Sequence, residues 1–322
     1  MNMVKAALRR LALIVSLGAA GLLASCGGGT QVEKFVPTRL LALGDENSVL
    51  VDGGDHNARK YTVNTIPADA STRDCKTGTI WVQYLAVTRG LVFPECNYGT
   101  GAVTDPPSRI YAQPGAKVAD LEAQIAAHGG LAQFRDTDLV AIFIGVNDVI
   151  EQFEKLDELG QAQIVANVET LGDRLAAQVN ALASTGARVL VLTVPDQSYT
   201  PYAAKAELAR PGSLQVLSQL SKRFNTRLGF SIIQDGHLIA LMKANDVVQS
   251  LVQNVSINVL VNVTDPVCDA TKAATVLDCT TATLVTDGSA TTWLWADDRH
   301  LSPAGHSFLG QAASAQVDRN PF

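Results

Sequence analysis

The sequence predicts an α/β fold built on a doubly wound, mostly parallel sheet. Three continuous apolar runs, each of the length of one buried strand, occupy residues 39–44, 138–144 and 188–194. Strands of parallel sheets are covered on both faces and are therefore apolar throughout, whereas half-exposed strands alternate. Helix-like patterns separate the runs, and successive strand–helix units favour a parallel sheet with right-handed crossovers.

The first strand should end at Gly44 and Asp45, in a tight turn at the edge where open α/β sheets place their chemistry. Residues 49–64 are rich in Gly, Asp and Asn, so they predict a loop with one short extended piece at 60–63. A core-facing helix is expected at 79–86, where large apolar side chains recur at helical spacing.

The later helices and strands are predicted from the same two patterns, apolar residues at helical spacing and short apolar runs. We expect helices at about 117–127, 161–184 and 214–228, and a short strand near 237–241. Residues 245–290 are polar and show little period, which indicates an irregular excursion over the rim of the site.

The N-terminus has the pattern of a signal peptide. Basic residues precede an apolar segment at 11–23, which is too short and too rich in glycine for a permanent spanning helix. Leu-Ala-Ser-Cys ending at Cys26 resembles a bacterial lipobox, which implies cleavage after residue 25 and acylation of Cys26. We therefore expect a signal peptide at 1–25, a flexible tether at 26–37, and one domain at 38–322 held at the membrane, with the outer membrane favoured. The alternative is a soluble secreted protein in which Cys26 is incidental.

Charge argues against nucleic acid as a partner. The chain has 25 basic and 31 acidic residues, and residues 1–25 contain three basic and no acidic ones. The mature chain would thus carry 22 positive against 31 negative charges, a net charge of −9. Phosphate binding requires a basic face, which this balance does not favour.

Four cysteines remain after Cys26 is set aside, and an even number in an exported chain suggests disulfides. Of the three possible connectivities, the local one is the most economical: Cys75 with Cys96 and Cys268 with Cys279. Free, buried cysteines are the alternative. No Cys-x-x-Cys occurs and the five histidines are scattered, so neither a metal site nor a cofactor is expected.

The turn Gly44-Asp45-Glu46-Asn47-Ser48 resembles the first sequence block of the GDSL or SGNH hydrolases, which usually reads Gly-Asp-Ser-Leu-Ser. Glu46 then stands at the position of the nucleophilic serine, and Ser48 falls on the second serine. Ser48 becomes an alternative nucleophile only if the turn shifts.

Three further segments resemble later blocks of that family in the right order. Gly115 matches a backbone oxyanion donor, and Asn147 of Gly-Val-Asn-Asp matches the side-chain donor. Asp297 and His300 match the Asp-x-x-His pair, in which the carboxylate orients the histidine base. Taken alone, Gly115 is better explained by a helix start and Asp297 with His300 by a solvated turn, and a helix cap is the alternative for Asn147. The order of the blocks along the chain favours the site.

The resemblance implies a three-layer α/β/α sandwich of the SGNH type and a small ester or lipid-like substrate. A carboxylate cannot form the stable acyl-enzyme that serine forms. The sequence therefore leaves open an ester hydrolase with an altered nucleophile position, a catalytically silent protein that binds a lipid, glycan or other ligand, and a hydrolase that uses Ser48. It says nothing on the oligomeric state.

Overall fold

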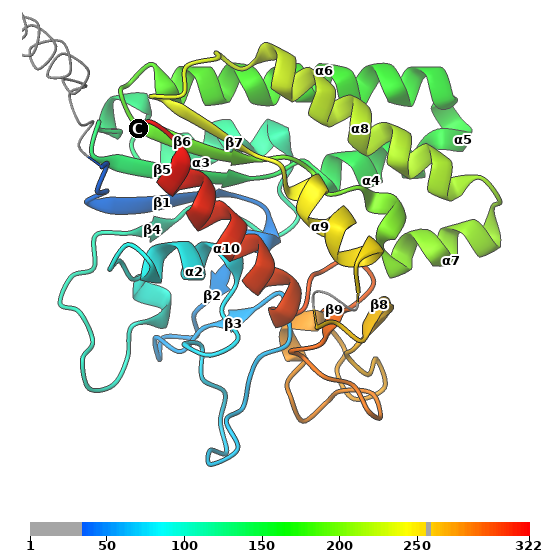
Figure 1. Cartoon of the computed structure of the whole chain (residues 1–322), viewed down its shortest axis with the longest axis horizontal. Coiled ribbons are helices and arrows are strands. Elements are labelled where there is room, and N and C mark those ends of the chain that lie inside the picture. Colours follow the sequence, from blue (N-terminus) through cyan, green and yellow to red (C-terminus); the bar gives the residue numbers. More distant parts are fainter. Residues whose placement is uncertain (1–33, 256–258) are drawn as a thin grey trace, which may run out of the picture. The chain divides into compact units, whose positions relative to one another are not determined.

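A five-stranded parallel sheet forms the centre of the protein, in the strand order β4-β1-β5-β6-β7. The computed structural model describes residues 34–255 and 259–322, and Figure 1 shows their arrangement. The strands are β1 (Arg39–Gly44), β4 (Arg109–Ile110), β5 (Asp138–Phe143), β6 (Arg188–Leu192) and β7 (Ile239–Met242). The interiors of β1 and β5 are fully buried, as expected for strands covered on both faces. The predicted α/β class with a mostly parallel sheet is confirmed.

Helices cover both faces of the sheet (Figure 1). The long helices α6 (Gln161–Ala183) and α8 (Ser213–Ser231) pack together on one face, and α2 (Trp81–Val87) and α10 (Pro303–Arg319) pack together on the other. The remaining helices are α3 (Leu121–Ala127), α4 (Val146–Glu154), α5 (Leu156–Leu159), α7 (Pro201–Ala209) and α9 (Ala244–Gln253). Among the described residues, no helix is long and apolar enough to cross a bilayer.

Two small sheets and a second core lie outside the main sheet. The strands β2 (Leu50–Val51) and β3 (Arg59–Lys60) pair antiparallel, and β8 (Asn262–Pro266) pairs in parallel with β9 (Trp293–Trp295). Residues 262–296 enclose a small apolar cluster of their own, to which Val63 contributes. We call this segment the late lobe.

Both disulfides have the predicted local connectivity. Cys75 is bonded to Cys96, and Cys268 to Cys279 within the late lobe. The alternative of free, buried cysteines is therefore wrong for these four residues. Cys26 lies outside the described residues.

Several boundaries differ from those expected. The segment 245–290 is not irregular throughout, because α9 covers Ala244–Gln253 and buries Val248 and Leu251. The helix expected at 117–127 is divided into a 3-10 turn at Val118–Asp120 and α3. The compact unit begins at Phe35, whose ring meets the ring of Phe322 edge to face at 5.7 Å.

Candidate active site

The candidate site lies where β1 and β5 end side by side. From β1 the chain continues to β4 on one side, while β5 lies on the other side, so this is the topological switch point of the sheet. Ligands of open α/β sheets bind outside the carboxyl ends of the strands at such a point. The turn after β1 carries Glu46, and the first turn of α4, which follows β5, carries Asn147, so the two side chains meet.

Gly44 allows the two turns to approach closely. Its φ is +133°, and a Cβ at this position would lie 1.9 Å from the carbonyl oxygen of Phe143. That same oxygen accepts a hydrogen bond from the backbone N–H of Asp45 at 3.0 Å. Only glycine fits here, because any side chain would collide with the backbone of β5.

The Glu46 side chain enters the site from a 3-10 turn and is almost completely buried. Its Oε2 accepts hydrogen bonds from the backbone N–H of Gly115 at 2.8 Å and from Nδ2 of Asn147 at 2.9 Å. Its Oε1 lies 3.5 Å from Nε2 of His300. One carboxylate therefore lies both between the two N–H donors and beside the histidine.

The two donors are held in place by contacts from α4. Asn147 also donates to the carbonyl of Ala116 at 3.2 Å, and Asp148 accepts from the backbone N–H of Val118 at 3.0 Å. Consecutive residues of α4 thus fix the segment that carries Gly115. Donors fixed in this way need no reorganisation when negative charge develops between them.

Asp297 orients His300 from the turn that follows β9. Both carboxylate oxygens lie 2.8 Å from Nδ1 of His300, and Oδ1 also accepts from the His300 backbone N–H at 2.8 Å. The ring is almost buried and packs near Tyr61, with centroids 5.8 Å apart. Nε2 points toward Glu46, but 3.5 Å is too long for a good hydrogen bond.

The three charged groups stabilise one another. Burial alone would lower the pKa of His300, but its contacts with Asp297 and Glu46 raise that pKa to about 9. Burial alone would raise the pKa of Glu46, but His300 and the N–H donors lower it to about 2. Burial likewise opposes ionisation of Asp297, and His300 nevertheless lowers its pKa. At neutral pH the site thus holds an imidazolium between two carboxylates.

Ser48 is placed differently from a nucleophile. It is fully buried, and its hydroxyl accepts a hydrogen bond from Nε1 of Trp81 at 3.2 Å. The structure does not pair it with His300. The reading in which Ser48 replaces the missing serine therefore has no geometric support.

A model of the family described as "GDSL-like Lipase/Acylhydrolase" matches residues 40–313, which include Glu46, Gly115, Asn147, Asp297 and His300. The chain belongs to this family. No curated protein matches it.

Solved structures with a similar fold include esterases. Axe2, an acetylxylan esterase from Geobacillus stearothermophilus, is 14 % identical with a TM-score of 0.45, over 89 % of this chain and 98 % of that one. A member of the lipolytic G-D-S-L family from Veillonella parvula is 12 % identical with a TM-score of 0.41, over 85 % and 95 %. LAE5, an α/β hydrolase from the Lake Arreo metagenome, is 19 % identical with a TM-score of 0.41, over 87 % and 94 %. Likeness at this level assigns no substrate to the chain.

The sequence did not indicate how three further polar residues support this GDSL-type site. Gln124 of α3 forms two hydrogen bonds with the backbone of Gly44, and Asp45 is fully buried behind the turn. Burial and the charge of Glu46 raise the pKa of Asp45 well above its usual value. Burial raises the pKa of Asp148 to about 6. A polar residue in an otherwise apolar helix face, as Gln124 is in α3, was the available signal.

His306 also lies at the edge of the GDSL-type site. It is completely buried, and its Nδ1 is 3.4 Å from the backbone N–H of Trp81. Burial lowers its pKa to about 3, so it is neutral at physiological pH. It connects α10 to the start of α2, which agrees with a packing role.

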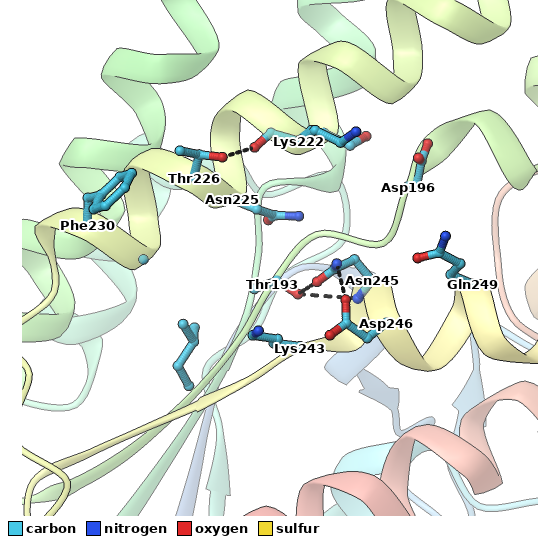
Figure 2. A pocket seen from close by; sticks show the side chains of 13 residues that line it. Thr193, Asp196, Lys222, Asn225, Thr226, Phe230, Lys243, Asn245, Asp246 and Gln249 are labelled. Carbon is cyan, nitrogen blue, oxygen red and sulfur yellow. Dashed lines mark hydrogen bonds between the residues drawn. The ribbon is translucent and has the colours of Figure 1, made fainter.

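Two of the cavities that the described residues form, both outside the reacting groups of the GDSL-type site, are lined in part by polar side chains. One, of about 460 Å³, opens between α8, α9 and the ends of β6 and β7, and Figure 2 shows its polar lining, including Thr193 and Asn245. The other, of about 450 Å³, borders Asp297 and is lined by Tyr202 and by late-lobe residues. Neither of these two cavities is lined by Glu46 or His300. Of the two, the second borders the dyad of Asp297 and His300.

Proposed function

We propose that this chain is a hydrolase of the bacterial cell envelope that acts on a small ester or lipid-like substrate, with Glu46 at the position of the family's serine. One observation carries the proposal. Two N–H donors, from Gly115 and Asn147, converge on Oε2 of Glu46, and the other oxygen of the same carboxylate lies 3.5 Å from Nε2 of His300. Donors that converge in this way stabilise the oxyanion of a tetrahedral intermediate.

An acyl ester could use this site only after the Glu46 carboxylate has left the donors. The ester carbonyl oxygen would then take the place of Oε2, and Glu46 with His300 would polarise an attacking water. Asp297 keeps the imidazole in the required orientation. Because His300 holds its proton up to a pKa of about 9, turnover that needs His300 as a base should appear only at alkaline pH.

The test compares the mature chain with Glu46→Ser on p-nitrophenyl acetate and butyrate. Serine is shorter, so it empties the oxyanion position and supplies a hydroxyl that His300 can activate. We expect Glu46→Ser to exceed the original chain by roughly 100-fold or more, and a second change, His300→Ala, to remove roughly 10²- to 10⁴-fold of that activity.

The control is Glu158→Gln, which removes an exposed carboxylate on α5 and should leave the rate unchanged. A Glu46→Ser protein that is folded by circular dichroism, yet no faster than the original chain, would contradict the proposed oxyanion site.

A catalytically silent binding protein is the second candidate, and the ion pair itself favours it. Oε2 of Glu46 already occupies both donors, and Oε1 lies 3.5 Å from Nε2 of His300, so the carboxylate itself fills the place of a substrate oxygen. This candidate is preferred if the original chain hydrolyses neither p-nitrophenyl esters nor alkyl halides and epoxides, while Glu46→Ser gains turnover of the p-nitrophenyl esters.

Location at the envelope rests on the sequence pattern around Cys26. We propose that acylation of this residue anchors the domain, with the outer membrane as the destination. The two disulfides support an oxidising compartment, because such bonds are rare in the cytosol.

A further inference from the structure

We propose that Glu46 is itself a nucleophile, directed at a saturated carbon that bears a leaving group, as in a primary alkyl halide or an epoxide. The ester that the site hydrolyses is then one formed on Glu46. This inference rests on the proposed function, since it uses the same donors and the same histidine.

The position of Oε2 favours attack by Glu46 on a saturated carbon over attack on an acyl carbon. An attack on an acyl carbon creates an oxyanion on the substrate, but both donors are bonded to Glu46 itself, at 2.8 and 2.9 Å. The product would also be a reactive anhydride. An attack on a saturated carbon creates no oxyanion, so Oε2 can stay where it is while Oε1 forms the new bond.

Oε1 is the available nucleophilic oxygen. It forms an ion pair with Nε2 of His300 at 3.5 Å, and that nitrogen has no hydrogen-bond partner among residues 34–255 and 259–322. Hydrogen bonds to Oε2 concentrate the accessible lone pairs of the carboxylate on Oε1. The side chain is 8 % exposed, so small substrates are favoured.

The first step balances as a displacement. Oε1 bonds to the saturated carbon, the bond from that carbon to the leaving group breaks, and the leaving group departs with its electron pair. A halide leaves as the anion. An epoxide oxygen takes the proton of the His300 imidazolium, which becomes neutral imidazole. The product is an alkyl ester of Glu46.

The second step uses the GDSL-type groups in their usual places. Water attacks the carboxyl carbon of the Glu46 ester, and neutral His300 takes its proton through Nε2 while Asp297 holds Nδ1. Negative charge develops on Oε2, where the N–H groups of Gly115 and Asn147 already lie. Collapse breaks the bond between the carboxyl carbon and Oε1, and the departing alkoxide takes the proton of the new carboxyl hydroxyl. The alcohol or diol leaves with the former Oε1, the water oxygen replaces it in the Glu46 carboxylate, and His300 is left as the imidazolium.

His300 can act as an acid in the first step and as a base in the second, because its charge depends on the charge of Glu46. Beside the carboxylate its pKa is about 9, so it is an acid at neutral pH. Esterification removes the negative charge from Glu46, which lowers the pKa of His300 and favours the base. After a halide displacement the imidazolium therefore loses its proton to solvent before water is activated.

The test is a single turnover of the mature chain in H₂¹⁸O with 1-bromobutane or with styrene oxide, in separate arms. We expect unlabelled oxygen in the first-turnover alcohol and ¹⁸O in the peptide that contains Glu46, read by mass spectrometry. His300→Gln should slow turnover roughly 100-fold or more and accumulate a butyl adduct on Glu46 with the bromide. Glu46→Gln should give neither adduct nor turnover, and Glu158→Gln should match the original chain.

Other outcomes separate the two proposals. Product that carries ¹⁸O in the first turnover means that water attacks the substrate directly, which overturns Glu46 as nucleophile. No adduct and no turnover with either electrophile overturns it as well, while a Glu46→Ser variant active on p-nitrophenyl esters keeps the proposed ester site. If that variant is also inert, the ester site itself is refuted.

Discussion

At the scale of single residues, the chemistry of the site depends on one carboxylate, that of Glu46. A serine at position 46 would end before the N–H donors, whereas Glu46 reaches both of them and also His300. The family's donors and dyad thus stabilise a side chain of the protein in place of a reaction intermediate.

The titration of His300 reports this contact directly. Its folded-state pKa of about 9 lies above the ordinary 6.5, so the stabilisation is full below about pH 6.5 and is lost as the pH rises through 9. In Glu46→Gln one negative neighbour is removed, and we expect the pKa of His300 to fall by about one unit or more.

NMR of the imidazole carbon-bound protons measures both values. His306→Gln serves to assign the neighbouring buried ring, whose pKa is lowered to about 3. An unchanged His300 midpoint in Glu46→Gln would show that the two side chains are not in contact in solution.

At the scale of elements, the site depends on how closely the turns after β1 and β5 approach. We expect Gly44→Ala to reduce the free energy of unfolding by more than Gly160→Ala does. Both glycines have positive φ, so each alanine meets backbone strain of about 1–3 kcal/mol. Only at Gly44 does the added Cβ also collide with a backbone atom, because nothing lies within 4 Å at Gly160.

Urea unfolding of the two variants measures the difference. The matched pair separates the collision from the strain. Equal losses of stability would mean that the turns can move apart without cost.

How much the sequence reveals differs from element to element. The runs that became β1, β5 and β6 were predictable because a strand buried on both faces is apolar at every position. Helix α9 was missed: its first cap, Lys243, offers no side-chain hydrogen bond, and its apolar face is only three turns long. Helix α7 was not predicted either, although Thr200 caps it and Pro201 begins it, which is a clearer signal than that of α9.

The candidate site was predictable as a set of residues but not as a geometry. Ordered motifs located Glu46, Gly115, Asn147, Asp297 and His300, and the structure brings these five together. No motif could show that Oε2 would take both donors, because that depends on side-chain length and on how closely two turns approach.

At the scale of the whole molecule, the chain enters the sheet at the edge opposite the site. Phe35 packs on Phe322 just before β1 begins, whereas Glu46 follows the end of β1. The compact unit therefore begins at the amino ends of the strands, whereas the acylation predicted at Cys26 falls outside the described residues.

Replacing that cysteine tests the anchor. In Cys26→Ser expressed in a bacterial host, acylation is impossible, so we expect the protein to leave the membrane fraction for the soluble or secreted one. Ser25→Ala, which keeps the cysteine and a small residue before it, is the control. Immunoblots of fractions measure the distribution, and a Cys26→Ser protein that stays in the membrane would contradict lipid anchoring.

The position of Glu46 has a practical consequence. Fluorophosphonate reagents label hydrolases by phosphonylating an activated hydroxyl, and this site offers none, since the hydroxyl of Ser48 is buried against Trp81. Surveys of bacterial enzymes that rely on such reagents would overlook this chain, however abundant it is. Alkylating reagents that esterify carboxylates are the ones suited to detect it.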